Sequence, residues 1–127
     1  MKRSGILGRD LLYAIGSLGH TDTFAVADCG LPIPPGVRVI DLAVVAGVPG
    51  FLDVLDALTA EVVTEHAIAA VEADDHAAGP ALRERFPGLE QVSHEQLKRL
   101  TADCRFIVRT GEARPYANVI LRSGVPF

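Results

Sequence analysis

The stretch Thr23-Phe24-Ala25-Val26-Ala27-Asp28 decides the fold class, because it is a short apolar run that ends on a carboxylate. Such a run is typical of a buried strand. The other predicted strands lie at residues 37–42, 61–68, 89–92, 104–109 and 118–121. Residues 61–68 are ambiguous between strand and helix, and their β-branched content favours a strand.

The segments between these strands carry helical signals. Residues 11–18 and 51–58 each place apolar side chains at the spacing of one helix face. Residues 73–86 are rich in alanine and predict a helix that is interrupted at Gly79-Pro80. Because strands alternate with helices along the chain, we expect a single three-layer α/β/α domain over residues 1–127, with a mixed, largely parallel sheet.

Two loop and cap signals add detail to this outline. Residues 29–36 contain three prolines and two glycines, so they predict a rigid surface loop rather than a helix or a central strand. Ser93-His94-Glu95-Gln96 is a capping box, in which Ser93 accepts from the Gln96 amide and the Gln96 side chain reaches back to the Ser93 amide. A helix is therefore expected from this box to about Asp103.

Composition excludes several classes of protein. Apolar residues make up 49% and charged residues 22% of the chain, which is enough apolar material for one core. The net charge of −4 argues against a nucleic-acid binder, and no apolar run is long enough for a transmembrane helix or a signal peptide. Cys29 and Cys104 match no metal or redox spacing and are interpreted as reduced thiols of a cytoplasmic protein. The positive mean hydropathy favours a homo-oligomer.

Nucleotide-binding and covalent-catalysis motifs are absent from the sequence. There is no Gly-rich dinucleotide loop, phosphate-binding loop or nucleophile elbow. The only lysines are Lys2 and Lys98, so Schiff-base chemistry is not expected. The four histidines match no zinc-ligand pattern, so a metal site is not predicted.

The remaining candidates are polar side chains at the ends of predicted strands and helices, namely His20, Asp28, His94, Tyr116 and Asn118. In open α/β sheets, ligands bind beyond the carboxyl ends of strands. Imidazole, carboxylate, phenol and amide groups suit acid–base work on a neutral, polyhydroxylated molecule. Each residue also has a structural interpretation, for example a helix cap for His20, an Asx turn with Gly30 for Asp28 and a core or interface aromatic for Tyr116. Spacing alone leaves the function open.

Other polar residues are interpreted as structural. Asp22 and Glu112 are expected to be solvated or bonded within loops, and His66 and His76 to be structural or exposed. Cys29 follows Asp28, whose negative charge disfavours a thiolate, so Cys29 is a poor nucleophile.

Several of these segments together resemble the signature blocks of the D-ribose pyranase family. The blocks are Gly19-His20-Thr21-Asp22-Thr23, Asp28-Cys29-Gly30-Leu31-Pro32-Ile33-Pro34, Gly47-Val48-Pro49, Ser93-His94-Glu95, Arg109-Thr110-Gly111-Glu112, Pro115-Tyr116-Ala117-Asn118-Val119-Ile120-Leu121 and Gly124-Val125-Pro126-Phe127. The similarity runs in register from about Gly5 to the last residue and is weakest at residues 68–92. Cys29 departs from the family, whose members usually carry alanine there. Because Cys29 lies next to a carboxylate of the binding set, this difference from the family bears on the affinity for the substrate rather than on the type of reaction.

The resemblance implies a cofactor-free isomerase that interconverts the β-pyranose and β-furanose forms of D-ribose and supplies the furanose to ribokinase. By position, His20 resembles the proton donor of the family. The residues that resemble its substrate-binding set are Asp28, His94, Tyr116, Ala117 (through its backbone) and Asn118. The family forms ring-shaped homo-oligomers, typically decamers, whose sites are completed by a neighbouring subunit.

Two alternatives remain open at this stage. The L-fucose mutarotases are a sister family with the same fold, but residues 30–34 and the Tyr116-Ala117-Asn118 block favour the ribose branch. The other alternative is a non-catalytic sugar-binding accessory of ribose transport, which would bind ribose without accelerating its exchange.

Overall fold

A single six-stranded sheet organises the chain in the computed structural model, which describes residues 1–127. The strands are β1 (Thr23–Ala27), β2 (Arg38–Asp41), β3 (Thr64–Ala70), β4 (Glu90–Val92), β5 (Phe106–Arg109) and β6 (Val119–Ser123). The helices are α1 (Arg9–Gly16), α2 (Phe51–Thr59), α3 (Ala78–Arg85) and α4 (His94–Leu100), with short 3-10 helices η1 (Val71–Asp75) and η2 (Thr101–Asp103). All predicted strands are present, and the ambiguous segment at residues 61–68 overlaps β3.

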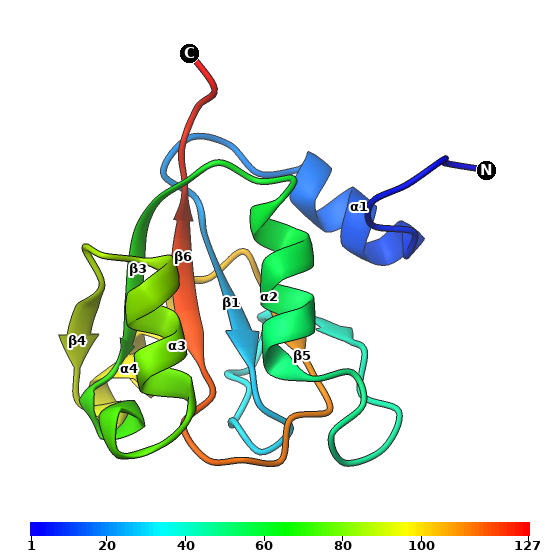
Figure 1. Cartoon of the computed structure of the whole chain (residues 1–127). Coiled ribbons are helices and arrows are strands. Elements are labelled where there is room, and N and C mark those ends of the chain that lie inside the picture. Colours follow the sequence, from blue (N-terminus) through cyan, green and yellow to red (C-terminus); the bar gives the residue numbers. More distant parts are fainter.

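The strand order is β2-β5-β1-β6-β3-β4. Strand β5 pairs in parallel with both β2 and β1, and β3 pairs in parallel with β4. Strand β6 is antiparallel to both of its neighbours, β1 and β3. The sheet is therefore mixed and largely parallel, as predicted. The carboxyl ends of β1 and β5 lie at the same end of the molecule, where β6 begins (Figure 1).

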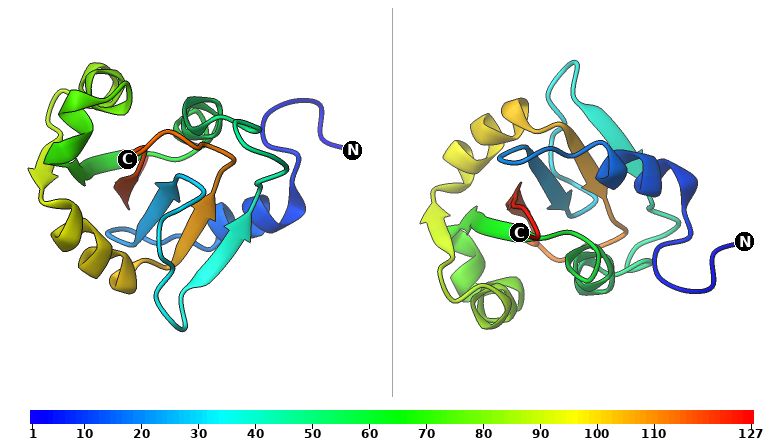
Figure 2. Two further views of the ribbon diagram at one scale, coloured as in Figure 1. Left: turned by 90° about the horizontal axis from the view of Figure 1, so that it is seen from below. Right: turned by 90° about the horizontal axis from the view of Figure 1, so that it is seen from above.

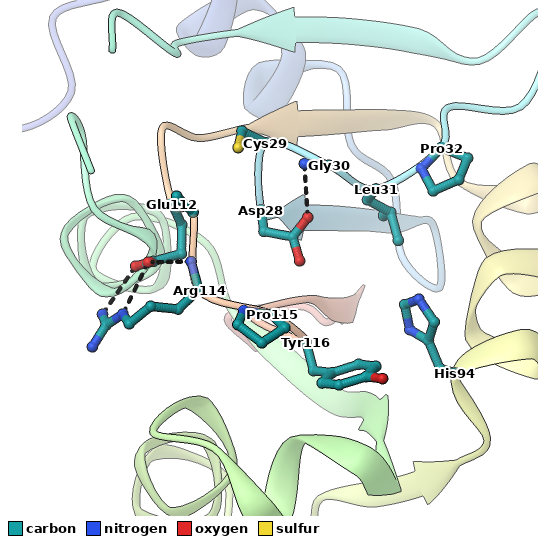
Figure 3. Close-up of a pocket in the computed structure, with 11 residues that line it drawn as sticks. Asp28, Cys29, Gly30, Leu31, Pro32, His94, Glu112, Arg114, Pro115 and Tyr116 are labelled. Atoms are coloured by element: carbon teal, nitrogen blue, oxygen red, sulfur yellow. Dashed lines mark hydrogen bonds and ion pairs between the residues drawn. The ribbon is translucent and has the colours of Figure 1, made fainter. Parts of the chain in front are cut away.

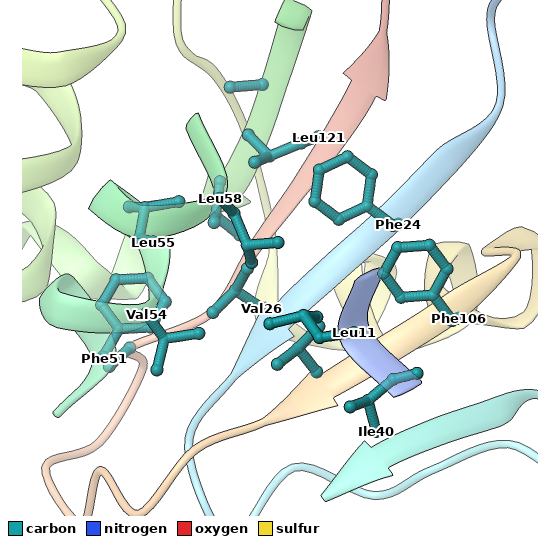
Figure 4. Close-up of a cluster of buried hydrophobic side chains, with 14 of the residues drawn as sticks. Leu11, Phe24, Val26, Ile40, Phe51, Val54, Leu55, Leu58, Phe106 and Leu121 are labelled. Carbon is teal, nitrogen blue, oxygen red and sulfur yellow. The ribbon is translucent and has the colours of Figure 1, made fainter. Parts of the chain in front are cut away.

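Helices cover both faces of the sheet, which confirms the three-layer architecture. Figure 2 shows α1, α2 and α3 on one face, with α4 and η2 on the other. The larger apolar cluster has 19 buried residues and lies beneath α1, α2 and α3, with the Phe24 and Phe106 rings stacked at 5.2 Å between centroids (Figure 4). A smaller cluster of eight buried residues includes Leu97 of α4 and Leu31 of the proline-rich loop. Burial of these apolar side chains is the main force that holds the layers together.

Two local predictions need correction. The Ala-rich segment is interrupted at His76 and Ala77, between η1 and α3, rather than at Gly79-Pro80. Pro80 fits in the first turn of α3 because the amide nitrogens there need no helical acceptor. Ser93 accepts from the Gln96 amide at 3.1 Å as expected, but the Gln96 side chain accepts from Arg99 instead of reaching back to Ser93. The box is thus only half formed.

No helix has both the length and the apolar character needed to cross a bilayer.

Candidate active site

A pocket of about 270 Å³ opens at the carboxyl end of β1 (Figure 3). Three segments form its walls: the loop after β1, the first residue of α4, and the loop between β5 and β6. The lining residues are Asp28, Cys29, Gly30, Leu31, Pro32, His94, Glu112, Ala113, Arg114, Pro115 and Tyr116. The pocket thus lies beyond the carboxyl ends of the parallel strands β1 and β5, the edge at which open α/β sheets bind ligands.

Asp28 is fixed in the pocket wall by Asn118 and Gly30. The Asn118 side-chain amide donates to Asp28 Oδ2 at 2.8 Å, and its carbonyl accepts from the Asp28 backbone amide at 2.9 Å. The Gly30 amide donates to Asp28 Oδ1 at 2.9 Å, which is the Asx turn that the sequence suggested. Asn118 is buried and does not line the pocket, so within one chain it positions Asp28. The carboxylate retains lone pairs that can accept from ligand hydroxyls.

His94 and Tyr116 are neighbours in the lining of the pocket. Their rings pack edge to face with centroids 5.1 Å apart. His94 begins α4, and its backbone amide donates to the Glu72 carboxylate at 2.9 Å. The Nδ1 atom of His94 is buried and has no hydrogen-bond partner within the chain. Because buried polar atoms are almost always paired, this nitrogen is a natural partner for a ligand hydroxyl.

Tyr116 has a strained backbone, with a φ of 61°. A bulky residue in this left-handed region costs about 1–3 kcal/mol, and such strain persists mostly at functional sites. The His76 ring lies 5.1 Å from the Tyr116 ring by centroid, so imidazoles pack against Tyr116 from two positions. This strain and packing place the phenol at the pocket.

Glu112 and Arg114 form an ion pair at the pocket wall. Two guanidinium nitrogens of Arg114 donate to the Glu112 carboxylate at 2.9 and 3.0 Å. The same carboxylate accepts from the Arg114 amide at 3.0 Å and from the first amide of α2, at Phe51. Glu112 is thus a buried residue that ties the β5–β6 loop to α2, rather than a solvated one.

Gly111 brings that loop close to the chain at residues 45–49. Its amide donates to the Pro49 carbonyl at 2.9 Å. A Cβ atom at this position would collide with the carbonyl oxygens of Val45 and Val48, so only glycine allows the approach. The glycine before Glu112 therefore has a structural role in forming the pocket.

The Glu112 ion pair makes stability depend on pH. Hydrogen bonding from Arg114 lowers the pKa of Glu112 from its ordinary value of 4.5 to about 2. The stabilisation is therefore complete above pH 4.5 and is lost as the pH falls toward 2. We expect Glu112→Gln to lower the free energy of unfolding by about 1–3 kcal/mol at pH 7. In denaturant titrations, the difference from wild type should shrink as the pH falls. A difference that is equal at neutral and acidic pH would contradict this assignment.

His20 lies at the other end of the sheet. It belongs to the turn between α1 and β1, which precedes the strand, whereas Asp28 follows it (Figure 1). A strand of five residues spans about 17 Å, so one chain does not bring these groups together. The His20 side chain is 53% exposed, and its Nε2 atom lies 3.1 Å from a carboxylate oxygen of Glu65. His20 thus remains available to a neighbouring molecule.

The structure gathers three of the candidate residues around one pocket: Asp28, His94 and Tyr116. Ala117 is buried and packs into the larger apolar cluster. Sequence reasoning missed Arg114, whose ion pair shows that Glu112 is bonded within its loop, the second of the two expectations for that residue, and not solvated. His76, interpreted as structural or exposed, packs against Tyr116, and no pattern in the sequence indicated that contact.

A pocket lined by a carboxylate, an imidazole and a phenol defines a binding site for a small polar molecule, and no cluster of three or more potential metal ligands accompanies it. Residues 1–126 match the model of the RbsD / FucU transport protein family. The chain is 58% identical to D-ribose pyranase 2 of Streptomyces griseus, with all of both chains covered. Bacillus subtilis RbsD, solved in complex with D-ribose, is 43% identical with a TM-score of 0.92 over all of both chains.

The chain therefore belongs to the RbsD / FucU family, and the resemblance read from its sequence is confirmed. A fucose mutarotase of Streptococcus pneumoniae, solved in complex with L-fucose, superposes with a TM-score of 0.75. Its chain is 24% identical, with 94% of each chain covered, so this likeness shows a common fold.

Proposed function

We propose that this chain is an isomerase that interconverts the β-pyranose and β-furanose forms of D-ribose. The observation that carries the proposal is the full-length likeness to a protein solved with D-ribose, at 43% identity and a TM-score of 0.92. The relative at 58% identity is a D-ribose pyranase. The pocket offers Asp28, His94 and Tyr116, whose polar groups suit a neutral sugar with several hydroxyls.

The reaction needs acid–base catalysis of ring opening and closing. To open a cyclic hemiacetal, a proton is delivered to the ring oxygen while the anomeric hydroxyl loses one. Closure through a different hydroxyl reverses these transfers and yields the other ring size. In the proposed mechanism His20 protonates the ring oxygen, since an imidazole can give or take a proton near neutral pH. The other site residues hold the sugar, and the step requires no cofactor or metal.

The holding groups have separate roles. Asp28 accepts from sugar hydroxyls while Asn118 and Gly30 fix its carboxylate. His94, through its unpartnered Nδ1, and Tyr116, through its phenol, bind further hydroxyls. Asn118 and the backbone of Ala117 are proposed to contribute contacts where the β5–β6 loop meets the sugar. This arrangement lets the open aldehyde turn and close through another oxygen.

The proposed site is shared between copies of the chain, because His20 and the pocket lie at opposite ends of β1. Contact between copies is supported by exposed apolar side chains, including Val44 at 75%, Val45 at 62% and Phe127 at 99% exposure. We propose that a cytoplasmic homo-oligomer, a decamer as in the family resemblance, brings His20 of one copy to the pocket of the next.

Exchange NMR on the anomeric protons of D-ribose tests the proposed function. Saturation transfer between pyranose and furanose signals should increase when the protein is added. The same experiment with L-fucose is the control for the sister activity. Enhanced α–β exchange confined to L-fucose would move the chain to the mutarotases. Line broadening of ribose without faster exchange would instead support a non-catalytic binding role.

A further inference from the structure

The imidazole of His20 is held by a single group within the chain. Its Nε2 atom lies 3.1 Å from Glu65 Oε2, and Nδ1 makes no hydrogen bond. The backbone of the turn is fixed separately, because the Thr21 amide donates to the Ser123 carbonyl at 2.9 Å. Thr21 has a φ of 70°, which is strained for a β-branched residue. The turn therefore fixes the backbone of His20. Glu65 is the one group of the chain that hydrogen-bonds to the His20 ring and so sets the direction of that ring.

Glu65 occupies an irregular position in β3. Thr64 pairs with Ser123 and His66 pairs with Arg122, so Glu65 is an extra residue without a partner of its own on β6. This is a β-bulge, a feature that often lies beside active sites and re-aims a side chain. The bulge thus places Glu65 at the level of the His20 turn.

Arg122 holds the second oxygen of the same carboxylate. Its Nε atom lies 2.9 Å from Glu65 Oε1, so one carboxylate bridges an arginine and a histidine. Another charged pair at this end of the sheet joins Arg105 to Asp22 at 3.5 Å. The Glu65 side chain is one-third exposed, so solvent weakens its ion pairs. Its effect on His20 therefore comes mainly from orienting the imidazole ring rather than from a strong charge interaction.

We propose that Glu65 is a positioning residue that fixes the tautomer and orientation of His20. A carboxylate only accepts hydrogen bonds, so the neutral imidazole must carry its proton on Nε2. Nδ1 is then the atom that faces away from Glu65 with a free lone pair. It takes the proton that the anomeric hydroxyl loses, and the imidazolium formed in this way delivers that proton to the ring oxygen. This inference rests on the proposed role of His20 and adds which nitrogen acts and what holds it.

Steady-state kinetics of D-ribose exchange, measured on the full-length protein, test the role assigned to Glu65. We expect Glu65→Ala to lower the exchange rate at saturating D-ribose about 10-fold, with the half-saturating concentration unchanged. Glu65→Gln keeps an acceptor oxygen and should restore most of the rate. Glu90→Ala is the matched control, because Glu90 makes the same kind of pair with His66, at 2.6 Å, and should not change the rate.

Nitrogen-15 NMR of the His20 ring gives a readout that fold stability alone does not change. The neutral wild-type ring should be protonated on Nε2, and Glu65→Ala should shift it to a mixture of tautomers. A wild-type ring protonated on Nδ1, or full activity in Glu65→Ala, would overturn the inference about Glu65. This holds even where His20→Ala loses activity and the proposed role of His20 therefore stands. If wild type itself does not accelerate exchange, the proposed function is wrong and this inference falls with it.

Discussion

Replacing His20 with alanine will lower the rate of pyranose–furanose exchange by about 10²- to 10⁴-fold, the range expected for loss of a general acid–base group. The effect should be on turnover, because the sugar-holding residues lie on the pocket side of the chain and are untouched. Exchange NMR with D-ribose at saturating concentration measures the rate, and a ribose titration followed by the same signals measures binding.

His66→Ala is the matched control for this substitution. His66 also pairs with a glutamate, and its side chain is partly exposed, but it is not among the residues proposed to act on the sugar. It should retain wild-type exchange. Wild-type exchange in His20→Ala would show that another group moves the proton.

The second large effect is expected at Asp28. Asp28→Asn leaves one acceptor oxygen where the carboxylate offered two, so the buried Asn118 amide and the Gly30 amide can no longer both be satisfied. The loss of a charged acceptor and the rearrangement that follows should weaken ribose binding by about 10- to 100-fold, or about 1–3 kcal/mol. Isothermal titration with D-ribose measures this change.

Asp56→Asn provides the comparison. Asp56 pairs with Arg85 on the surface, away from the pocket, and its substitution should leave ribose affinity as in wild type. Equal affinities for wild type and Asp28→Asn would remove Asp28 from the binding site.

The order and type of the elements could be predicted because apolar spacing determines which segments can be buried. The same is true of Ser93 as a helix cap, since capping depends on a local side chain. The position of the break before α3 could not be predicted, because it follows from the packing of η1 against the body of the domain. The β-bulge at Glu65 depends on pairing with a strand more than fifty residues away. Local patterns carry no information about such pairings.

The candidate site, too, could be predicted only where local sequence patterns determine it. Asp28, His94 and Tyr116 were identified from residue type and position, and the pocket unites them. The ion pair of Glu112 with Arg114 was missed, because burial of the carboxylate depends on how the loop meets α2. The separation of His20 from Asp28 follows from the predicted strand itself, because His20 precedes that strand and Asp28 ends it.

The most direct test of the central claim is complementation between two inactive variants. His20→Ala and Asp28→Ala chains are purified separately, unfolded, mixed in equal amounts and refolded together, and exchange of D-ribose is measured by NMR. If each site takes His20 from one copy and Asp28 from another, about a quarter of the sites in a random mixture are intact. Activity should therefore return to about a quarter of the wild-type value per chain. A mixture that refolds into oligomers but stays as inactive as its components would contradict a site shared between copies.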